Sequence, residues 1–559
     1  MDPVISTFPS ASLLLVAFAG LGCHIIFNRL EPHNPLVFTS LLVLPPLVLS
    51  AFLGTYGNSI FMTIGISFLT YLTTILASVV LYRVSPFHPL ASYPGPLAYK
   101  ITKLWLAGNA LGGKQHLIIQ DLHQRYGDVV RVGPNELSFS GKSAILPMMG
   151  TKGMPKGQWW DGRMPPESNP VRSLLALRDP EAHGRRRRIW LRAFSASALK
   201  ECDAVVRKRL AQLVEIFTDN SGQTVDLSQW IGRFMYDVMN DIVFGGGVEL
   251  MRDGDRDGLY AMVDDYLPMA LFQSQIPWVG VLSMWIPFLG KNVKKFRSYA
   301  VNCAIARKVH GSPRKDIFYH LMDEAGLENE PPSLAQVISD SSTAIVAGSE
   351  TSSTALCNLF WLLLSNPITY SRLQVEIDSF GPSVLDADSQ KRLVYLNACI
   401  NETLRLFPAV LSGSARAPLI GGGGHTIGPH FVPEGTGTAV HSYTLQRDPR
   451  YFSPSPDSFL PERWLSDSER RTLKPSTFNS TDEIIHDLSA FIPFSFGPAN
   501  CVGKNLALQE MRMVICTLMG KFDMRFAEGF DVRSWEDNLC DYFITRKGKL
   551  PVIFLPRSH

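Results

Sequence analysis

The sequence predicts a mainly α-helical protein with a small β portion, preceded by N-terminal transmembrane helices. Three observations predict it. Long apolar stretches fill most of the first 84 residues. Signals for two short strands around a Gly-Pro turn lie at residues 129–139. After them, helical patterns dominate until about residue 410.

Length and composition limit the functions open to this chain. With 559 residues it can bury a large core and hold one large domain with an appendage. A net charge of +3 is too small to indicate nucleic-acid binding. The eight cysteines are scattered without a CxxC pair, so we expect reduced thiols rather than a disulfide framework or a structural zinc site.

Residues 1–84 are expected to form a membrane anchor with up to three transmembrane helices. The candidate spans lie at about residues 11–27, 36–53 and 59–81. Each approaches the roughly 20 residues that a helix needs to cross a bilayer. Pro45 and Pro46 interrupt the second span and make it the weakest candidate. A signal peptide is the alternative for the first span, but no basic residue precedes it and two more apolar stretches follow.

Basic residues indicate the side of the membrane on which the rest of the chain lies. Arg83, Lys100 and Lys103 follow the third apolar stretch, so the positive-inside rule places the large remainder in the cytosol. Residues 85–97 hold four prolines and predict a stiff hinge rather than a helix. The main folded domain is then expected at residues 98–559.

One cysteine stands in a sequence that favours a special environment. Gly497, Pro498 and Gly503 suit tight turns on either side of Cys501. The apolar pattern from Lys504 onward predicts a buried helix, so the cysteine precedes a helix N-terminus. Free N–H groups and the helix dipole favour a thiolate there, and a thiolate can be an axial haem ligand. The ordinary alternative is a buried structural thiol.

A second unusual stretch lies inside a long helix predicted from Leu334 to about Leu364 and capped by Ser333. Its middle reads Ala347-Gly348-Ser349-Glu350-Thr351-Ser352. Glycine and several hydroxyl side chains weaken a helix, and a glutamate in a buried helix is costly without a purpose. An exposed polar face would explain these residues, but the flanking residues are apolar.

Charged residues in two other helical segments fit more than one interpretation. Arg185 to Arg188 would ordinarily form a solvated face or a nucleic-acid patch. We discount nucleic acid because the chain carries a predicted membrane anchor. Glu402 and Arg405 share one face of a helix predicted over residues 393–406, a pairing that many helices have by chance.

Together these motifs resemble the cytochrome P-450 superfamily, from about residue 86 to the C-terminus. The haem-binding loop of that family has the pattern Phe-x-x-Gly-x-basic-x-Cys-x-Gly. Four residues match it: Phe494, Gly497, Cys501 and Gly503. Ala499 departs from it, because most members have arginine or histidine at that position. The resemblance implies the cytochrome P-450 fold, with haem b (iron protoporphyrin IX) as the cofactor.

The resemblance also implies roles near the iron and on the oxygen side. Cys501 would be the axial haem iron ligand, within a cofactor-binding loop that includes the matching phenylalanine and glycines. Ala347 and Gly348 would leave room for dioxygen. Glu350 and Thr351 would relay protons to it, because cleavage of the O–O bond needs protons in a site that holds little water.

Further residues would bind the haem propionates or brace the loop. His183 and Arg187 occupy the places of the family's Trp-x-x-x-Arg and lie on one helix face. With Arg416 they would bind the cofactor and replace the charge missing at Ala499. A separate buried network would join three residues: Glu402, Arg405 and, from a Pro-Glu-Arg-Trp segment, Arg463. Four arginines would form a basic docking face for an acidic reductase: Arg185, Arg186, Arg188 and Arg192.

The implied function is that of a haem-thiolate monooxygenase, which inserts one oxygen atom from O2 into a lipophilic small molecule. Electrons from NADPH would arrive through NADPH–cytochrome P-450 reductase, with cytochrome b5 as an optional partner. The protein would be a multi-pass protein of the endoplasmic reticulum membrane. The N-terminus and the cysteine loop look most like enzymes of basidiomycete fungi, which favours secondary metabolism such as terpenoid tailoring.

Three alternatives stay open. One is a xenobiotic or aromatic-compound hydroxylase. Another is a haem-thiolate isomerase or dehydratase that needs no oxygen, against which the acid–threonine pair argues. The third is a non-catalytic membrane haem protein, against which the small residues of the predicted oxygen pocket argue.

Overall fold

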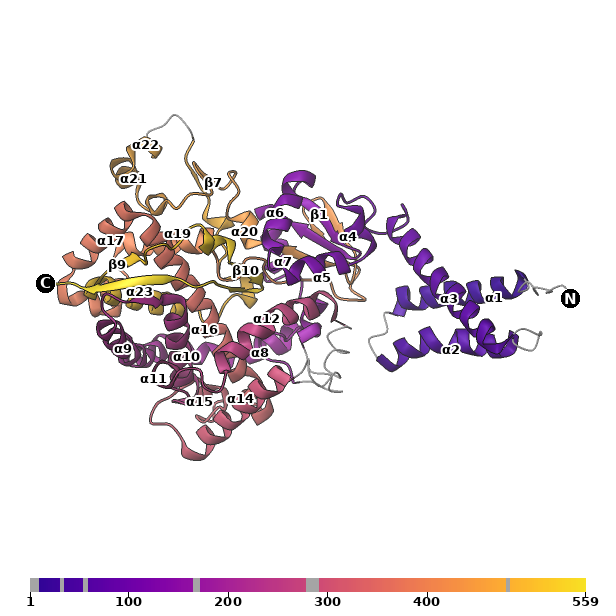
Figure 1. Cartoon of the computed structure of the whole chain (residues 1–559), viewed down its shortest axis with the longest axis horizontal. Coiled ribbons are helices and arrows are strands. Elements are labelled where there is room, and N and C mark those ends of the chain that lie inside the picture. The colour runs from indigo at the N-terminus through magenta and orange to yellow at the C-terminus, as the bar shows by residue number, and fades with distance from the viewer. Residues whose placement is uncertain are drawn as a thin grey trace.

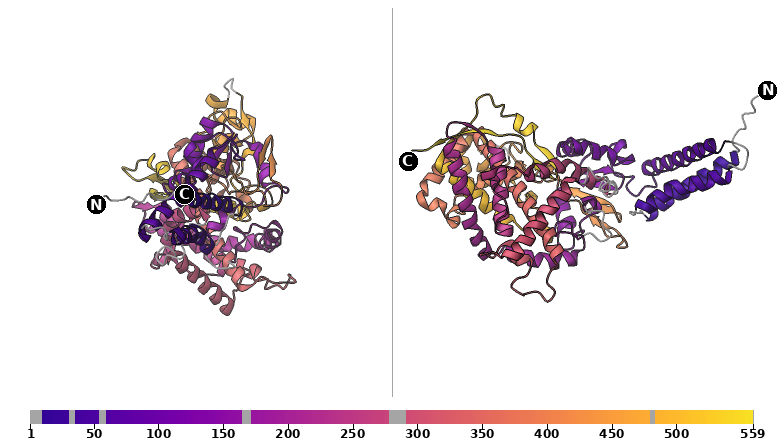
Figure 2. Two further views of the ribbon diagram at one scale, coloured as in Figure 1. Left: turned by 90° about the vertical axis from the view of Figure 1, so that its right-hand side faces the viewer. Right: turned by 60° about the horizontal axis from the view of Figure 1, so that its bottom comes forward.

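The computed structural model describes residues 10–30, 35–53, 59–163, 171–277, 291–478 and 483–558. Figure 1 shows a rounded, mainly helical body with the C-terminus at one end of the long axis and an N-terminal helical bundle at the other. The right-hand view of Figure 2 shows the same arrangement, with the bundle projecting from the body. The predicted mainly α fold with a small β portion is confirmed.

The bundle contains α1 (Ser10–Leu30), α2 (Pro35–Leu53) and α3 (Ile60–Val84). Within the described residues, these three helices are long and apolar enough to cross a membrane. Val16 and Tyr71 are buried between them, whereas large apolar side chains such as Phe18 and Phe61 face outward. Apolar surface of this extent needs an apolar surrounding, which lipid provides.

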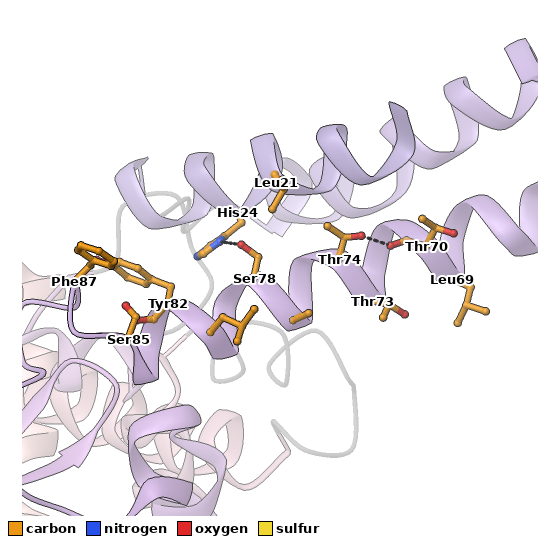
Figure 3. Close-up of a pocket in the computed structure, with 12 residues that line it drawn as sticks. Leu21, His24, Leu69, Thr70, Thr73, Thr74, Ser78, Tyr82, Ser85 and Phe87 are labelled. Carbon is orange, nitrogen blue, oxygen red and sulfur yellow. Dashed lines mark hydrogen bonds between the residues drawn. The ribbon is translucent and has the colours of Figure 1, made fainter. Parts of the chain in front are cut away.

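A largely apolar groove with several hydroxyl side chains runs between α1 and α3 (Figure 3). His24 Nδ1 and Ser78 Oγ form a hydrogen bond across it, 2.6 Å long. Gly20 lets the two helices approach closely, because a Cβ there would lie 3.1 Å from the carbonyl oxygen of Tyr71. These contacts hold α1 against α3, as interhelical hydrogen bonds and small residues commonly do in membranes.

Residues 85–96 form turns and lead directly into the body. The segment packs on the first strand of the body: the Arg131 N–H donates to the Pro94 carbonyl oxygen at 2.7 Å, and Leu90 is buried. Gly95 is required by this packing, because a Cβ there would lie 2.3 Å from the Arg131 carbonyl oxygen. The predicted hinge is therefore docked on the body rather than extended in solvent.

Most of the body is helical. Its helices before the long central one are α4 (Leu97–Ile101), α5 (Leu104–Leu111), α6 (Gln115–Tyr126), α7 (Ile145–Met149), α8 (Pro180–Ala193), α9 (Ala196–Asp219), α10 (Leu227–Phe244), α11 (Leu250–Asp253), α12 (Leu259–Gln275), α14 (Lys291–His310) and α15 (Ile317–Leu321). The central helix is α16 (Leu334–Ser365). After it come α17 (Pro367–Ser379), α18 (Ala387–Gln390), α19 (Val394–Leu406), α20 (Ser442–Leu445), α21 (Asp467–Leu473), α22 (Pro475–Phe478), α23 (Lys504–Lys521) and α24 (Ser534–Asp537).

The central helix α16 matches its predicted bounds and organises the body. It begins with a capping box in which Ser333 and Gln336 exchange hydrogen bonds with each other's backbone N–H groups. It packs against α10, α19 and α23, whose buried side chains form the main hydrophobic core with it. The prediction of a second helix from Lys504 is also confirmed by α23.

The strands of the body are short. They are β1 (Val129–Gly133), β2 (Glu136–Phe139), β3 (Thr224–Asp226), β4 (His425–Ile427), β5 (His430–Val432), β6 (Gly437–Val440), β7 (Phe452–Ser453), β8 (Ile485–His486), β9 (Phe522–Phe526), β10 (Cys540–Tyr542), β11 (Ile544–Arg546) and β12 (Pro551–Pro556). In the described part of the chain they form sheets in the orders β1-β2-β6, β3-β12-β9, β4-β5, β7-β8 and β10-β11. The β2–β6 pair is parallel. The β1–β2 hairpin confirms the strands predicted at residues 129–139.

Candidate functional site

A cavity in the body collects most of the residues that the sequence singled out. Nine predicted residues line it: His183, Arg187, Ala347, Gly348, Thr351, Arg416, Phe494, Cys501 and Gly503. They come from α8, from α16, from the loop between α19 and β4, and from the loop that carries the cysteine. Five other predicted residues of the described chain lie behind this lining: Glu350, Gly497, Glu402, Arg405 and Arg463.

A backbone hydrogen bond and a closely packed glycine fix the conformation of the cysteine loop. Any other residue at the glycine position would force the neighbouring backbone to move. The Cys501 N–H donates to the Phe494 carbonyl oxygen at 2.9 Å. Gly497 has φ +71°, and a Cβ there would lie 1.9 Å from the Met149 carbonyl oxygen of α7. At Gly503 a Cβ would meet Phe194 only at 3.6 Å, which is an ordinary contact. The steric demand for glycine therefore falls on Gly497.

Cys501 lies deep in the body and is accessible from the cavity that it borders. Burial raises the pKa of its thiol above the ordinary value. The N–H groups of Gly503 and Lys504 and the Arg187 guanidinium oppose this rise without cancelling it. The helix N-terminus thus favours the thiolate as expected but does not secure it alone, whereas a coordinated metal ion deprotonates a thiol outright.

Four nitrogen-bearing side chains gather along one side of the cavity, and we call them the basic cluster: Lys156, His183, Arg187 and Arg416. Lys156 Nζ donates to the carbonyl oxygens of Leu174 and Leu175 at 2.9 and 2.7 Å. Arg187 donates to the carbonyl oxygen of Asn500 at 2.7 Å and to its side-chain oxygen. Arg187 therefore contacts the residue between Ala499 and Cys501.

The charges of the basic cluster are poorly compensated. Burial, with Arg416 and Arg187 nearby, lowers the pKa of Lys156 to about 7. Burial, with Lys156 nearby, lowers the pKa of His183 to about 4, so this imidazole is neutral near pH 7. Arg416 Nε is buried without a hydrogen-bond partner, and neither arginine forms an ion pair with any described residue. Buried cations of this kind call for an anionic partner, and carboxylates suit arginine best.

Two arginines of the predicted docking face are engaged inside the body instead. Arg186 pairs with the buried carboxylate of Asp340 at 3.0 Å. Arg192 pairs with Glu328 and lies 3.5 Å from Asp323. The prediction of a four-arginine docking face is therefore wrong for Arg186, which the buried Asp340 holds below the surface, whereas Arg192 is half-buried and forms an ion pair with a half-buried glutamate. Arg185 and Arg188 do lie on the surface.

Helix α16 contributes small and polar residues to the lining of the cavity. Thr351 Oγ1 donates to the Ala347 carbonyl oxygen at 2.6 Å. Gly348 lines the cavity and also lets α10 pack closely, since a Cβ there would lie 2.5 Å from Met239 Sδ. The carboxylate of Glu350 is buried, with Oε2 3.6 Å from Lys547 Nζ. Burial alone would lower the pKa of Lys547. Glu350 and other nearby groups outweigh burial, so the pKa of this lysine is raised overall.

Glutamate 510 of α23 also lines the cavity, next to α16. Ser352 Oγ donates to its Oε2 at 2.9 Å. Sequence reasoning missed this residue, although a glutamate in an apolar helix was the signal that identified Glu350. It also missed Lys156 and Lys547, which stand in loops where no spacing pattern distinguishes them from surface lysines.

The predicted buried network of Glu402, Arg405 and Arg463 is present in the structure. Arg405 donates to both oxygens of Glu402 at 2.8 Å, and Arg463 Nε lies 3.5 Å from Oε1. Trp464 Nε1 and the Leu460 N–H complete the set at 2.9 and 3.1 Å. Burial alone would raise the pKa of Glu402. The contacts with Arg405, Arg463 and Trp464 outweigh burial and hold this pKa below the ordinary value. We call these five residues the brace.

The brace connects to the segment before the cysteine loop through one glutamine. Arg405 donates to the Gln446 carbonyl oxygen at 2.7 Å, and Gln446 Nε2 donates to the Arg405 carbonyl oxygen at 2.9 Å. The Ile492 N–H in turn donates to Gln446 Oε1 at 2.9 Å. A path of buried hydrogen bonds therefore runs from Glu402 to Ile492, in the segment that leads into the cysteine loop at Phe494.

Comparison with known proteins covers nearly the whole chain. Residues 94–551 match the family model described as Cytochrome P450. The chain is 31% identical over 530 residues to Cytochrome P450 monooxygenase nodW of Hypoxylon pulicicidum, covering 92% of this chain and 93% of that protein. It is 30% identical to Cytochrome P450 67 of Uromyces fabae (96% and 98% covered) and to the averantin hydroxylase of Dothistroma septosporum (89% and 91% covered).

Proposed function

The chain belongs to the cytochrome P450 family, and we propose that it is a haem-thiolate monooxygenase that inserts one oxygen atom from O2 into a lipophilic small molecule. The observation that carries this proposal is the composition of one cavity. Cys501 and the basic cluster lie on its lining together with Gly348 and Thr351. When bound, haem supplies the iron that binds and activates dioxygen.

The donor set of the cavity fits haem. Cys501 would coordinate the iron. Arg187, Arg416 and Lys156 would hold the two propionates, whose charges would compensate the buried cations and give Arg416 Nε a partner. Neutral His183 would donate one N–H. This assignment accounts for the missing basic residue at Ala499, because Arg187 already contacts the adjacent Asn500.

The polar residues of α16 would manage protons. Thr351 holds a proton at Oγ1, which points to the Ala347 carbonyl oxygen and can turn into the cavity. Glu350 Oε1 is buried without a hydrogen-bond partner among the described residues, and Lys547 Nζ lies 3.6 Å from its Oε2. One turnover consumes the substrate C–H bond, O2, two electrons and two protons, and yields an alcohol and water. The chain must therefore deliver two protons to a site that excludes bulk solvent.

The rest of the lining favours an apolar substrate. Trp160, Leu174, Val410 and Phe543 border the cavity. Ala409 borders it too. Apolar walls with few polar groups select lipophilic compounds and keep water away from the reaction.

Cellular context follows from the N-terminal helices and from the relatives. We place the protein in the endoplasmic reticulum membrane as a multi-pass protein with a cytosolic catalytic domain, supplied with NADPH electrons by a cytochrome P-450 reductase and, where needed, by cytochrome b5. Names of fungal relatives such as averantin hydroxylase support a role in secondary metabolism, such as terpenoid tailoring. Xenobiotic or aromatic-compound hydroxylation is the alternative role.

Co-expression with a reductase and isotope-labelled dioxygen tests the proposed activity. Turnover of a lipophilic substrate should require NADPH and O2 and should place one labelled oxygen atom in the product. The Cys501→Ser variant should form none. Product that forms without O2 would instead indicate an isomerase or dehydratase, and it would contradict the proposal.

A further inference from the structure

Two segments that are far apart in the sequence supply apolar side chains to the cavity. Residues 409–414, which we call the wall loop, contribute Ala409 and Val410. The β10–β11 hairpin contributes Phe543 and Ile544. The shape that the cavity offers to a lipophilic substrate therefore depends on how the wall loop and the hairpin are held against each other.

One buried carboxyl joins the two segments. Asp541 lies on β10, is 0% exposed and is not part of the cavity lining. Its Oδ1 accepts a hydrogen bond from Ser412 Oγ of the wall loop at 3.0 Å and another from the Phe543 N–H at 3.2 Å. Ser412 stands 129 positions earlier in the chain. A single oxygen atom therefore ties the wall loop to the turn that carries Phe543.

The backbone of Phe543 adopts a conformation that needs such support. Its φ is +76°, in the left-handed region that bulky residues rarely adopt. Its ring packs against Trp159 and Trp160, with ring centroids 5.1 and 5.3 Å apart. Trp160 Nε1 in turn donates to Ser414 Oγ of the wall loop at 3.1 Å. Strained residues persist where their surroundings fix them, and they cluster at sites that contact ligands.

Packing alone does not explain a carboxyl at position 541. Asp541 Oδ2 is buried without a hydrogen-bond partner among the described residues. It lies 4.0 Å from His116 Nδ1 of α6, which is also buried and without such a partner in the described chain. Burying a carboxyl with one unpartnered oxygen is costly, and an apolar side chain would avoid that cost. The hydrogen bonds accepted by Oδ1 are what an apolar side chain would not supply.

A second link between the wall loop and the hairpin does not involve Asp541. The Thr545 N–H and Oγ1 both donate to the Ala409 carbonyl oxygen, at 3.1 and 3.0 Å. Thr354 Oγ1 of α16 donates to the Thr545 carbonyl oxygen at 3.0 Å. Because these bonds remain when Asp541 is replaced, the hairpin should stay attached, and the change should be confined to the turn at Phe543 and to the wall loop.

We propose that Asp541 is a positioning residue that fixes the wall loop against the turn at Phe543 and thereby determines which part of a lipophilic substrate is presented for oxidation. The proposal deepens the monooxygenase function above and rests on it. Asp541 acts through Ser412 and Phe543, because its own side chain does not border the cavity. Its effect should therefore appear in the fit and orientation of bound molecules rather than in haem binding.

Azole probes that ligate the haem iron test this without turnover. Imidazole alone is too small to report on the cavity walls, whereas the phenyl ring of 1-phenylimidazole must pack against them. In haem-loaded Asp541→Ala, the spectral dissociation constant of 1-phenylimidazole should rise several-fold, while that of imidazole is unchanged. Asp541→Asn keeps an acceptor oxygen and should restore the wild-type value. An equal ratio of the two dissociation constants in wild type and Asp541→Ala would overturn the proposal.

A milder variant keeps the test decisive if Asp541→Ala does not load haem. Ser412→Ala leaves the carboxyl in place and removes only its bond to the wall loop. It should shift the azole ratio in the same direction by a smaller factor. With the lipophilic compound that is oxidised in the labelled-dioxygen experiment, it should also broaden the distribution of hydroxylated products. An unchanged azole ratio in Ser412→Ala would count against Asp541 as a positioning residue.

A matched control separates positioning from stability. Asp237 of α10 is also 0% exposed, and its oxygens accept the N–H groups of Leu250 and Met251 at 2.7 and 2.9 Å, outside the cavity lining. Burial raises the pKa of Asp237 and of Asp541 to about 6. Asp237→Ala should lower the free energy of unfolding without changing the azole ratio. An equal shift in both alanine variants would indicate general loosening and overturn the proposal.

Failure of this inference can be distinguished from failure of the proposed function. A wild type that binds both azoles but forms no product from any lipophilic compound with reductase, NADPH and O2 would refute the monooxygenase function. Product formation with an azole ratio and a product distribution that do not respond to Asp541→Ala would refute only the role of Asp541.

Discussion

Glu402 and Glu510 are both glutamates on helices that flank the cysteine loop, and both are almost completely buried, at 0% and 1% exposure. Their chemistry differs because their partners differ. Glu402 accepts hydrogen bonds from two arginines, a tryptophan and a backbone N–H group, and its pKa is lowered. Glu510 accepts one bond from a serine, and its pKa is raised to about 8.

The contrast shows that the number and charge of donors, rather than burial, decides what a buried carboxyl does. A carboxylate with every lone pair engaged is fixed in one protonation state and one position, which suits a brace. A carboxyl with a free oxygen can exchange its proton, which suits a relay.

The largest effect is expected from breaking the brace. Glu402→Ala leaves Arg405 and Arg463 as unpaired buried cations, which costs about 3–5 kcal/mol and disrupts the path to the cysteine loop. We expect protein that cannot retain haem. Haem content per protein measures this, with the exposed Glu434→Ala as the control. Stable holoprotein from the Glu402 variant would contradict the role of the brace.

Removing the relay hydroxyl should leave the haem site intact and affect only coupling. Thr351→Ala loses the proton held at Oγ1, so we expect normal haem and substrate binding with most reducing equivalents released as hydrogen peroxide. The measurement compares NADPH consumed, product and peroxide. Fully coupled turnover in this variant would show that Thr351 is outside the proton relay. It would also weaken the distinction between the structural role of Glu402 and the proton-supplying role of residues on α16.

Haem retention should depend more on Arg187 of the basic cluster than on the identity of the residue at Ala499. Arg187→Ala removes a cation and the contact with Asn500, so haem should dissociate at least ~10-fold faster, equivalent to about 1.4 kcal/mol. Ala499→Arg should be tolerated, because it adds the basic residue common in the family. Haem transfer to an acceptor protein gives both rates. Unchanged retention in the Arg187 variant would leave the charge missing at Ala499 without a replacement.

A gradual effect is expected in the pH dependence of stability. Because the pKa of Glu510 rises from an ordinary 4.5 to about 8 on folding, the unfolded chain releases this proton first as pH increases. Wild type should therefore lose stability relative to Glu510→Gln between pH 5 and 8, by at most about 1.4 kcal/mol per pH unit. Denaturant unfolding at several pH values measures the difference. A difference independent of pH would show that Glu510 is ionised throughout.

Much of this architecture could be predicted from the sequence, because its signals are local. Apolar runs of membrane length, the capping serine at Ser333, and the helix after Gly503 depend on neighbouring residues only. The cysteine loop and the Glu-x-x-Arg pair could be identified because fixed spacings carry their chemistry. The contacts between Glu402, Arg405 and Arg463 then followed from the resemblance.

The residues that escaped prediction depend on tertiary contacts. Lys156 and Lys547 are ordinary lysines in sequence, and only packing buries them beside the cavity and Glu350. The arginine run was read as one surface, but Asp340, which is 154 positions away, takes Arg186. Glu510 could have been found, because a glutamate between buried methionine and leucine positions raises the same question as Glu350.

The central claim is that Cys501 holds haem in the cavity between α16 and the cysteine loop. The most direct measurement is the absorption spectrum of the reduced, carbon monoxide-bound protein, compared between wild type and Cys501→His. The account predicts the red-shifted band of thiolate-ligated haem in wild type and a band of imidazole-ligated haem in the variant. A wild-type spectrum of the imidazole type, or an unchanged thiolate band in the variant, would contradict the account.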